Sequence, residues 1–200
     1  CLTEVKKQSP DIVLLPELAT TGYSCQDHFR EKENYFLAMN IIKKIIESKL
    51  TDNMLVVIGN PIIFNNKKYN TMTYILNNEI KLIRPKITLA DDGNYREARF
   101  FSSWEYGLFK TFTIDLSPFG IEQKNVPIGN AIIELNGIKI GTEIYEELWT
   151  SNENNRVNAL NGSTKIKVHD ELYKNGVNVL LNSSGSHFEM RKLETRIDLI

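Results

Sequence analysis

Two side chains suited to acyl-transfer chemistry follow apolar runs of this sequence. Glu17 comes directly after DIVLLP, and Lys86 comes directly after KLIRP. A carboxylate within hydrogen-bond reach of a nucleophile takes its proton and later activates water, if burial raises its pKa toward neutrality. An ammonium beside a carbonyl oxygen stabilises the negative charge that develops there. Taken singly, such residues are more often solvated loop charges or strand boundaries, so their value depends on whether the fold brings them together.

A third segment, GTEIYEELWT from Gly141 to Thr150, has the pattern of a buried strand that ends in a nucleophile turn. The residue at the turn is Tyr145, where a cysteine would be expected to act as the nucleophile. Glu146 and Glu147 follow it. Glu147 is interpreted as an ordinary surface or helix-start carboxylate.

The elements that must position these residues alternate between strands and helices, which predicts a mixed α/β fold. Apolar runs rich in β-branched residues that end in polar turns predict strands at 11–16, 54–64, 69–84, 131–145 and 177–187. Helical spacing of apolar residues predicts helices at 1–10, 36–50, 167–176 and 190–200. Asn77–Asn78 and Asn136–Gly137 predict hairpin turns, and Gly176 predicts a left-handed helix C-cap.

Two regions fall outside this alternation. Residues 90–127 are predicted to be a long irregular segment, and loops of that length are usually functional or mobile. Residues 151–164 are polar and Asn-rich and are interpreted as an insertion. The chain begins and ends within helical patterns, so residues 1–200 are expected to be one domain that is incomplete at both ends.

Composition indicates an ordinary globular domain. The 200 residues are 42% hydrophobic with a net charge of −1, and no basic surplus points to nucleic acid. No apolar run has transmembrane length and no signal peptide is apparent, which favours a cytoplasmic protein without a membrane partner. The two cysteines, Cys1 and Cys25, have no metal-site spacing. The three histidines, His28, His169 and His187, are expected in surface or turn roles.

Five motifs in order give the sequence a specific resemblance. PELATTGYSCQDHF, VVIGNPIIFNNKKYNTMTYILNNEIKLIRPK, LADDGNYREARFF, GTEIYEELWT and NSSGSH together resemble the N-terminal amidase domain of glutamine-dependent NAD synthetases, of the eukaryotic type, within the nitrilase superfamily. The likeness covers nearly the whole chain. It implies an αββα sandwich and the hydrolysis of the glutamine side-chain amide by a Glu, a Lys and a Cys through a thioester.

Carried over residue by residue, the resemblance assigns the general base to Glu17, the cation beside the oxyanion to Lys86 and the nucleophile position to Tyr145. It places Tyr23, Tyr95, Glu146 and Ser184 at the glutamine head group, with Glu146 suited to the α-ammonium. Packing is the alternative for these four residues, because buried tyrosines and turn serines are common. Glu97 and Glu147 are further candidates beside the pocket, although an ordinary surface or helix-start carboxylate is the favoured interpretation of Glu147.

Tyrosine at the cysteine position predicts that glutamine hydrolysis is lost or very weak. An ordinary phenol has a pKa of about 10, against about 8.5 for a thiol, so the phenolate is scarce at neutral pH. The ring is also expected to fill the space that the substrate amide needs. Neither Cys25, interpreted as a small buried hydrophobe, nor Cys1 is expected to replace the nucleophile.

The resemblance also implies partners. Ammonia would pass to an ATP- and Mg-dependent synthetase domain of the same parent chain, this domain needing no cofactor of its own, and the parent is expected to be a homo-oligomer. Two alternatives remain open from the sequence. The domain could be a non-catalytic scaffold for assembly or partner binding, which Tyr145 favours, or a nitrilase-type amidase for another substrate, against which NYRE and SGSH argue.

Overall fold

The computed structural model describes residues 2–91, 95–151, 167–185, 190 and 192–197. The helices are α1 (Leu2–Lys6), α2 (Lys32–Glu47), α4 (Val168–Lys174) and α5 (Lys192–Ile197), with 3-10 turns η1 (Tyr23–Arg30), η2 (Glu97–Arg99), η3 (Ser117–Phe119) and η4 (Tyr145–Ser151). The strands are β1 (Ile12–Leu14), β2 (Leu55–Phe64), β3 (Lys67–Leu76), β4 (Glu79–Pro85), β5 (Thr111–Ile114), β6 (Val126–Gly129), β7 (Ile133–Leu135), β8 (Ile138–Ile144) and β9 (Val179–Ser183).

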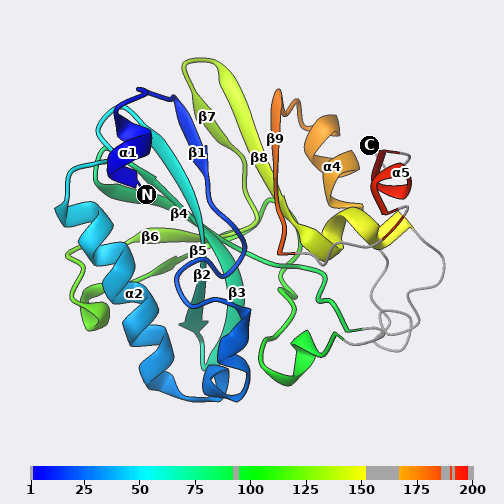
Figure 1. The fold of residues 1–200 in the computed structure, drawn as a ribbon, viewed down its shortest axis with the longest axis horizontal. Coiled ribbons are helices and arrows are strands. Elements are labelled where there is room, and N and C mark those ends of the chain that lie inside the picture. The colour runs from blue at the N-terminus through cyan, green and yellow to red at the C-terminus, as the bar shows by residue number, and fades with distance from the viewer. Residues whose placement is uncertain (1, 92–94, 152–166, 186–189, 191, 198–200) are drawn as a thin grey trace.

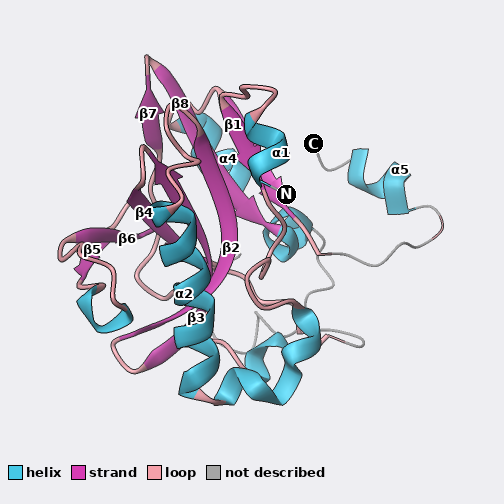
Figure 2. Cartoon of the chain, turned by 60° about the vertical axis from the view of Figure 1, so that its left-hand side comes forward, coloured by secondary structure: helices cyan, strands magenta, loops and turns pink. Residues whose placement is uncertain are grey.

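Two sheets lie between helices, which confirms the αββα sandwich. A six-stranded sheet in the order β1-β2-β3-β4-β6-β5 faces a three-stranded sheet in the order β7-β8-β9. Figure 1 shows α2 on the outer face of the larger sheet and α4 beside the smaller one. Figure 2 shows α2 lying along β2 and β3. None of the described helices is long and apolar enough to cross a membrane.

The alternation of side chains along β2 explains how the layers form. Val56 and Ile58 pack with Met39 and Ile42 of α2. Leu55 and Val57, which point to the opposite face of the strand, pack between the sheets. In a strand successive side chains point to opposite faces, so an unbroken apolar run is buried on both. The inter-sheet layer consists of Leu55, Val57, Met72, Tyr74, Leu82, Ile140 and Ile144. On the far side of the smaller sheet, α4 contributes Val168 and Leu172.

The predicted turns are confirmed by their backbone angles. Asn77 and Asn78 have φ of 52° and 62°, and Asn136 and Gly137 have φ of 51° and 79°. Gly176 has φ of 80° directly after α4, as a left-handed C-cap requires. The predicted helix at 36–50 is the four-turn α2, shifted toward the N-terminus.

Two expectations are wrong. The segment 90–127 is not irregular throughout, because β5 and the start of β6 lie within it and extend the larger sheet beyond β4. These strands are only four residues each, too short for a clear period of two. His169 is buried in α4, with Nδ1 3.1 Å from Glu143 Oε2, rather than at the surface. His28 is exposed, as expected, whereas Cys1, His187 and nearly all of 151–164 lie outside the described residues.

Candidate active site

Glu17 is fixed by a close approach of two backbones. It lies in the turn after β1, where Gly59 of β2 donates its N–H to Pro16 O at 3.2 Å. A Cβ at position 59 would lie 2.2 Å from Leu18 N and 2.3 Å from Pro16 O, so only glycine lets the turn pack here. From the smaller sheet, Ser183 Oγ donates to Leu15 O at 3.0 Å. Both sheets therefore hold the turn that carries Glu17.

Lys86 follows β4 and its side chain is 1% exposed. Its ammonium donates to Glu17 Oε1 and to Glu97 Oε2, each at 2.8 Å. Burial alone would lower the pKa of Lys86, but the charges of the two carboxylates and their hydrogen bonds outweigh burial and raise it. The side chain is therefore a fixed ammonium, as stabilisation of an oxyanion requires.

Asn70 completes this group. Its Nδ2 donates to Glu17 Oε1 and to Glu97 Oε1, each at 2.7 Å. We refer to Glu17, Asn70, Lys86 and Glu97 as the Lys86 cluster. Burial raises the pKa of Glu97, the neighbouring Glu17 raises it further, and Lys86 opposes both. Glu17 Oε2 is buried, and no described group donates to it at normal hydrogen-bond geometry, although the Tyr23 hydroxyl lies within reach of the Glu17 carboxylate. That oxygen is thus available to accept a proton from a nucleophile or from water.

Tyr145 begins η4 directly after β8 and is 5% exposed. Its φ is 33°, a conformation that non-glycine residues rarely adopt and that marks strained turns at functional sites. The Tyr145 hydroxyl donates to Tyr95 Oη at 2.9 Å, and Lys86 Nζ lies 5.6 Å from the centroid of the Tyr145 ring. The ring therefore stands beside the ammonium, at the turn where the sequence pattern places a nucleophile.

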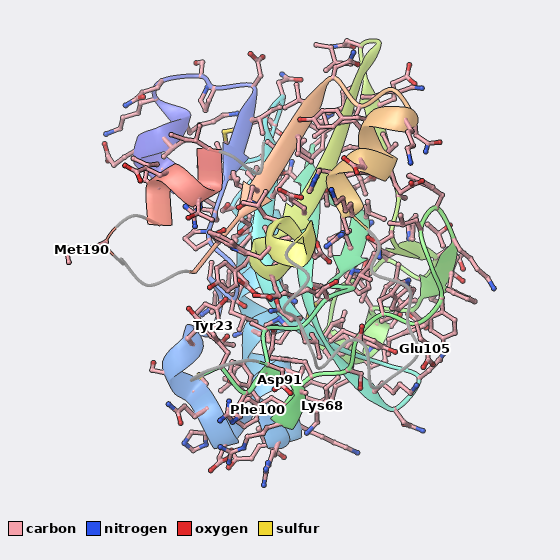
Figure 3. The ribbon with its side chains drawn as sticks, turned by 90° about the vertical axis from the view of Figure 1, so that its right-hand side faces the viewer. Tyr23, Lys68, Asp91, Phe100, Glu105 and Met190 are labelled. Atoms are coloured by element: carbon pink, nitrogen blue, oxygen red, sulfur yellow. The ribbon has the colours of Figure 1, made fainter. Side chains whose placement is uncertain are left out.

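A cavity of about 390 Å³ opens onto this group. Six of its fourteen described lining residues are aromatic, and the full lining consists of Leu18, Tyr23, Gln26, Phe29, Lys86, Ala90, Tyr95, Arg96, Glu97, Arg99, Phe100, Phe101, Tyr145 and Gly185. The labels of Tyr23 and Phe100 locate it in the lower half of Figure 3. Tyr23 packs so closely on Gly185 that a Cβ there would lie 2.2 Å from its ring. Tyr23 as a whole residue is 44% exposed, but burial of its hydroxyl, the charge and hydrogen bond of Glu17 and the charge of Glu97 raise the pKa of Tyr23, so its phenol stays neutral.

The structure brings together most of the residues singled out from the sequence. Glu17 and Lys86 are in contact, and Lys86, Tyr145, Tyr23 and Tyr95 line one cavity with Glu97. The other two predicted residues are absent from the described lining. Glu146 is buried beside Tyr145, and Ser184 Oγ donates to Asn182 Oδ1 at 2.6 Å. Contacts of these residues with a glutamine head group stay predictions.

Glu147 corrects the surface interpretation. It is fully buried, and its Oε2 accepts from Arg84 Nη1 at 2.6 Å. The sequence favours a surface or helix-start carboxylate, but the η4 turn places this side chain against Arg84 of the larger sheet and Ile144 of the smaller one. Arg84 held the missing signal, because an arginine inside the apolar run KLIRP needs a buried anion as partner. Asn70, inside β3, had no comparable signal in the sequence.

No cluster of three or more His, Cys, Asp or Glu side chains among the described residues could hold a metal ion. The cavity chemistry is that of a buried acid, a buried ammonium and phenols. Such a set supports proton transfer and oxyanion stabilisation, and it needs a nucleophile to complete acyl transfer.

Comparisons with known proteins agree with this geometry. The family described as carbon-nitrogen hydrolase matches residues 1–200. The chain is 41% identical over 188 residues to a glutamine-dependent NAD(+) synthetase of Oryza sativa subsp. indica, covering 92% of this chain and 23% of that protein. It is 40% identical over 187 residues to the enzyme of the same name from Saccharomyces cerevisiae, covering 92% and 24%. The chain thus spans about a quarter of the length of these curated relatives.

Solved structures show the same fold. A glutamine-dependent NAD(+) synthetase from Cytophaga hutchinsonii superposes with a TM-score of 0.73 at 26% identity, covering 100% of this chain and 29% of that one. An amidase from Nesterenkonia sp. superposes with a TM-score of 0.64 at 11% identity, covering 96% and 58%, and shows the fold alone. The resemblance drawn from the motifs is confirmed at the level of family and fold.

Proposed function

Because this chain belongs to the carbon-nitrogen hydrolase family, we propose that it is the glutaminase-type domain of a glutamine-dependent NAD synthetase. We further propose that its hydrolysis of glutamine is lost or very weak, because Tyr145 occupies the position of the nucleophile. The observation that carries the proposal is the contact between Lys86 and Glu17 directly beside the Tyr145 ring. The acid and the ammonium of an amide-hydrolysing site are present. The side chain that should attack the amide is a phenol.

The geometry supports a definite role for each group in an intact site. A thiol at position 145 would lose its proton to Glu17 Oε2 and attack the glutamine amide carbon, and Lys86 Nζ would stabilise the resulting oxyanion. The tetrahedral intermediate would then collapse. Glu17 would protonate the departing nitrogen, so that ammonia leaves and a thioester remains. Water would then attack the thioester and give up a proton to Glu17. The thiolate would leave and take up that proton, which releases glutamate and restores the thiol.

Tyr145 opposes each of these steps. Its hydroxyl lies against Tyr95 Oη, and its ring occupies part of the wall beside Lys86. A phenolate is scarce at neutral pH, and an aryl ester would have to replace the thioester. We expect ammonia, when the parent enzyme uses it, to come from solution rather than from this cavity.

Ammonia release from glutamine by the full-length protein tests the proposal. We expect no turnover above background for the unaltered protein and turnover for Tyr145→Cys. The control Tyr145→Cys/Lys86→Met should be inactive, because its oxyanion lacks a cation. Robust turnover by the unaltered protein would refute the loss of activity. A folded Tyr145→Cys protein that releases no ammonia would refute the retained acid–ammonium machinery.

A second candidate function is a non-catalytic scaffold within the same parent enzyme. The filled nucleophile position favours it, because a ring beside Lys86 reduces the space for a substrate amide. It predicts a stable homo-oligomer that does not bind glutamine, whereas a disabled amidase site still binds it. Calorimetric titration of glutamine into the unaltered protein, with sedimentation of the same sample, separates the two. ATP and Mg²⁺ belong, in both proposals, to a synthetase domain elsewhere in the parent chain.

A further inference from the structure

One buried carboxylate, that of Glu147, joins the two backbone segments that flank the site. Its Oε1 accepts from the N–H of Ile87 at 2.6 Å. Its Oε2 accepts from the N–H of Ile144 at 2.7 Å and from Arg84 Nη1 at 2.6 Å. All three donors point at a side chain that is fully buried.

The positions of these donors matter more than their number. Ile87 follows Lys86 in the chain, and Ile144 precedes Tyr145. Arg84 lies on β4 of the larger sheet and Ile144 ends β8 of the smaller one, so Glu147 connects the two sheets at the level of the cavity. A buried backbone N–H that loses its acceptor costs free energy, so both segments are held to this carboxylate.

We propose that Glu147, neutralised by Arg84, is a positioning residue that sets where residue 145 stands relative to Lys86 Nζ. It is not among the residues that line the described cavity, and it acts through the backbone on each side. The inference deepens the proposed function and rests on it for its kinetic readout. Charge and donor count both require a carboxylate at this place, because a carboxylate accepts from several donors at once.

An amide cannot replace this group. The glutamine side chain offers one acceptor oxygen, and its NH₂ would face either Ile87 N–H or both Ile144 N–H and Arg84, all of which are themselves donors. Glu147→Gln keeps the volume of the side chain and removes the hydrogen bond that anchors one of the two backbone segments. It therefore moves residue 145 and Lys86 apart without emptying the core.

The test is made in the full-length protein carrying Tyr145→Cys. Glu147→Gln is added to it, and the matched control adds Ile42→Ala, which removes buried contacts between α2 and the larger sheet, away from the cavity. Circular dichroism first confirms that each variant is folded at the assay temperature. Two quantities are then measured: kcat and KM for glutamine hydrolysis, and the pH midpoint for alkylation of the introduced thiol by iodoacetamide.

We expect Glu147→Gln to lower kcat about 100-fold with KM changed less than about threefold, because displacement of a reacting group by about 1 Å costs this much. We expect the alkylation midpoint to rise by about one pH unit, because an ammonium farther from the thiol stabilises the thiolate less. Ile42→Ala should change kcat by less than about threefold and leave the midpoint in place. A purely structural role for Glu147 predicts that Glu147→Gln behaves as Ile42→Ala does.

The two readouts separate the failure of this inference from that of the proposed function. If Tyr145→Cys hydrolyses glutamine, kcat tests the positioning role of Glu147. A kcat of Tyr145→Cys/Glu147→Gln within about threefold of that of Tyr145→Cys overturns the inference. If Tyr145→Cys releases no ammonia, the proposed function fails and the alkylation midpoint decides instead. An unchanged midpoint then overturns the positioning role, and a raised one supports it.

Discussion

Arg84 and Lys86 are buried cations two residues apart at the end of β4, and they differ in what surrounds them. Each side chain is 1% exposed and each is paired with glutamate. The partner of Arg84 is Glu147, whose oxygens also accept from two backbone N–H groups. Lys86 is paired with two carboxylates and stands in the wall of the cavity.

This difference separates structural stabilisation from capacity for chemistry. Around Arg84, one positive and one negative charge cancel, and the carboxylate of Glu147 accepts three hydrogen bonds. The Lys86 cluster instead has two carboxylates for one ammonium, and burial raises the pKa of Glu97. A buried group with spare acceptor capacity beside a cavity is where perturbed proton affinity becomes useful. Ion pairing alone therefore does not identify the reactive group, whereas unequal charge and access to the cavity do.

The largest expected effect is on the Arg84 side. Arg84→Met leaves Glu147 buried without its cation, and we expect the free energy of unfolding to fall by about 3–5 kcal/mol. Chemical denaturation at neutral pH measures it. The control Lys67→Met removes a pair in which Lys67 and Glu105 are 42% and 53% exposed, and it should cost less than about 1 kcal/mol. Equal losses in the two variants would contradict the distinction.

Lys86→Met should cost less, about 1–3 kcal/mol. It leaves Glu17 and Glu97 without their ammonium, but water from the adjoining cavity can reach these carboxylates, and one of them can take up a proton. The same denaturation experiment measures the loss. A loss in the free energy of unfolding equal to or above that of Arg84→Met would show that water from the cavity does not stabilise the unpaired carboxylates of the Lys86 cluster.

The sequence predicts one side of this comparison much better than the other. Glu17, Lys86 and Tyr145 each end an apolar run, so their gathering at strand ends follows from the strand pattern and from the family resemblance. The surroundings of these groups follow only in part: Glu97 is expected beside the pocket, whereas the contact of Asn70 with Glu17 and the burial of Glu147 against Arg84 are not. Asn70 lies within β3 and Glu147 within a turn, and only the tertiary packing of the two sheets shows that each is a buried acceptor or donor.

The fold shows the same division. Long elements with a clear period, such as α2 and β2, are predicted with shifts of only a few residues at their ends. The four-residue strands β5 and β6 are missed, because pairing with a neighbouring strand rather than their own pattern stabilises them. Local sequence specifies the elements that carry the side chains of the candidate site, and packing specifies what surrounds those side chains.

A smaller effect tests the cavity side directly. Tyr145→Phe removes the hydrogen bond to Tyr95 Oη while keeping the ring beside Lys86. Because the pair lines the cavity, water can replace the lost partner, and we expect a loss of about 0.5–1.5 kcal/mol in the free energy of unfolding. Ammonia release should stay at background, as in the unaltered protein. A loss above about 3 kcal/mol would place this hydrogen bond among the main stabilising contacts.

The last expected effect is a change in how steeply the free energy of unfolding varies with pH. Burial raises the pKa of Glu97 above 4.5, so the folded state binds more protons than the unfolded state just above that pH. The contribution of Glu97 to stability is therefore fully present below pH 4.5 and is lost as the pH rises through the raised pKa. The side chain in Glu97→Gln cannot ionise, so the free energy of unfolding of this variant should fall less steeply as the pH rises above 4.5.

Glu143 provides the control for that slope. Burial raises its pKa too, although it lies between β8 and α4 and pairs with His169 rather than Lys86. Glu143→Gln should therefore flatten the same profile independently, and the two changes should add in the double variant because the groups share no partner. If Glu97→Gln leaves the profile unchanged while Glu143→Gln flattens it, the excess negative charge lies outside the Lys86 cluster. The contrast with Arg84 would then rest on cavity access alone.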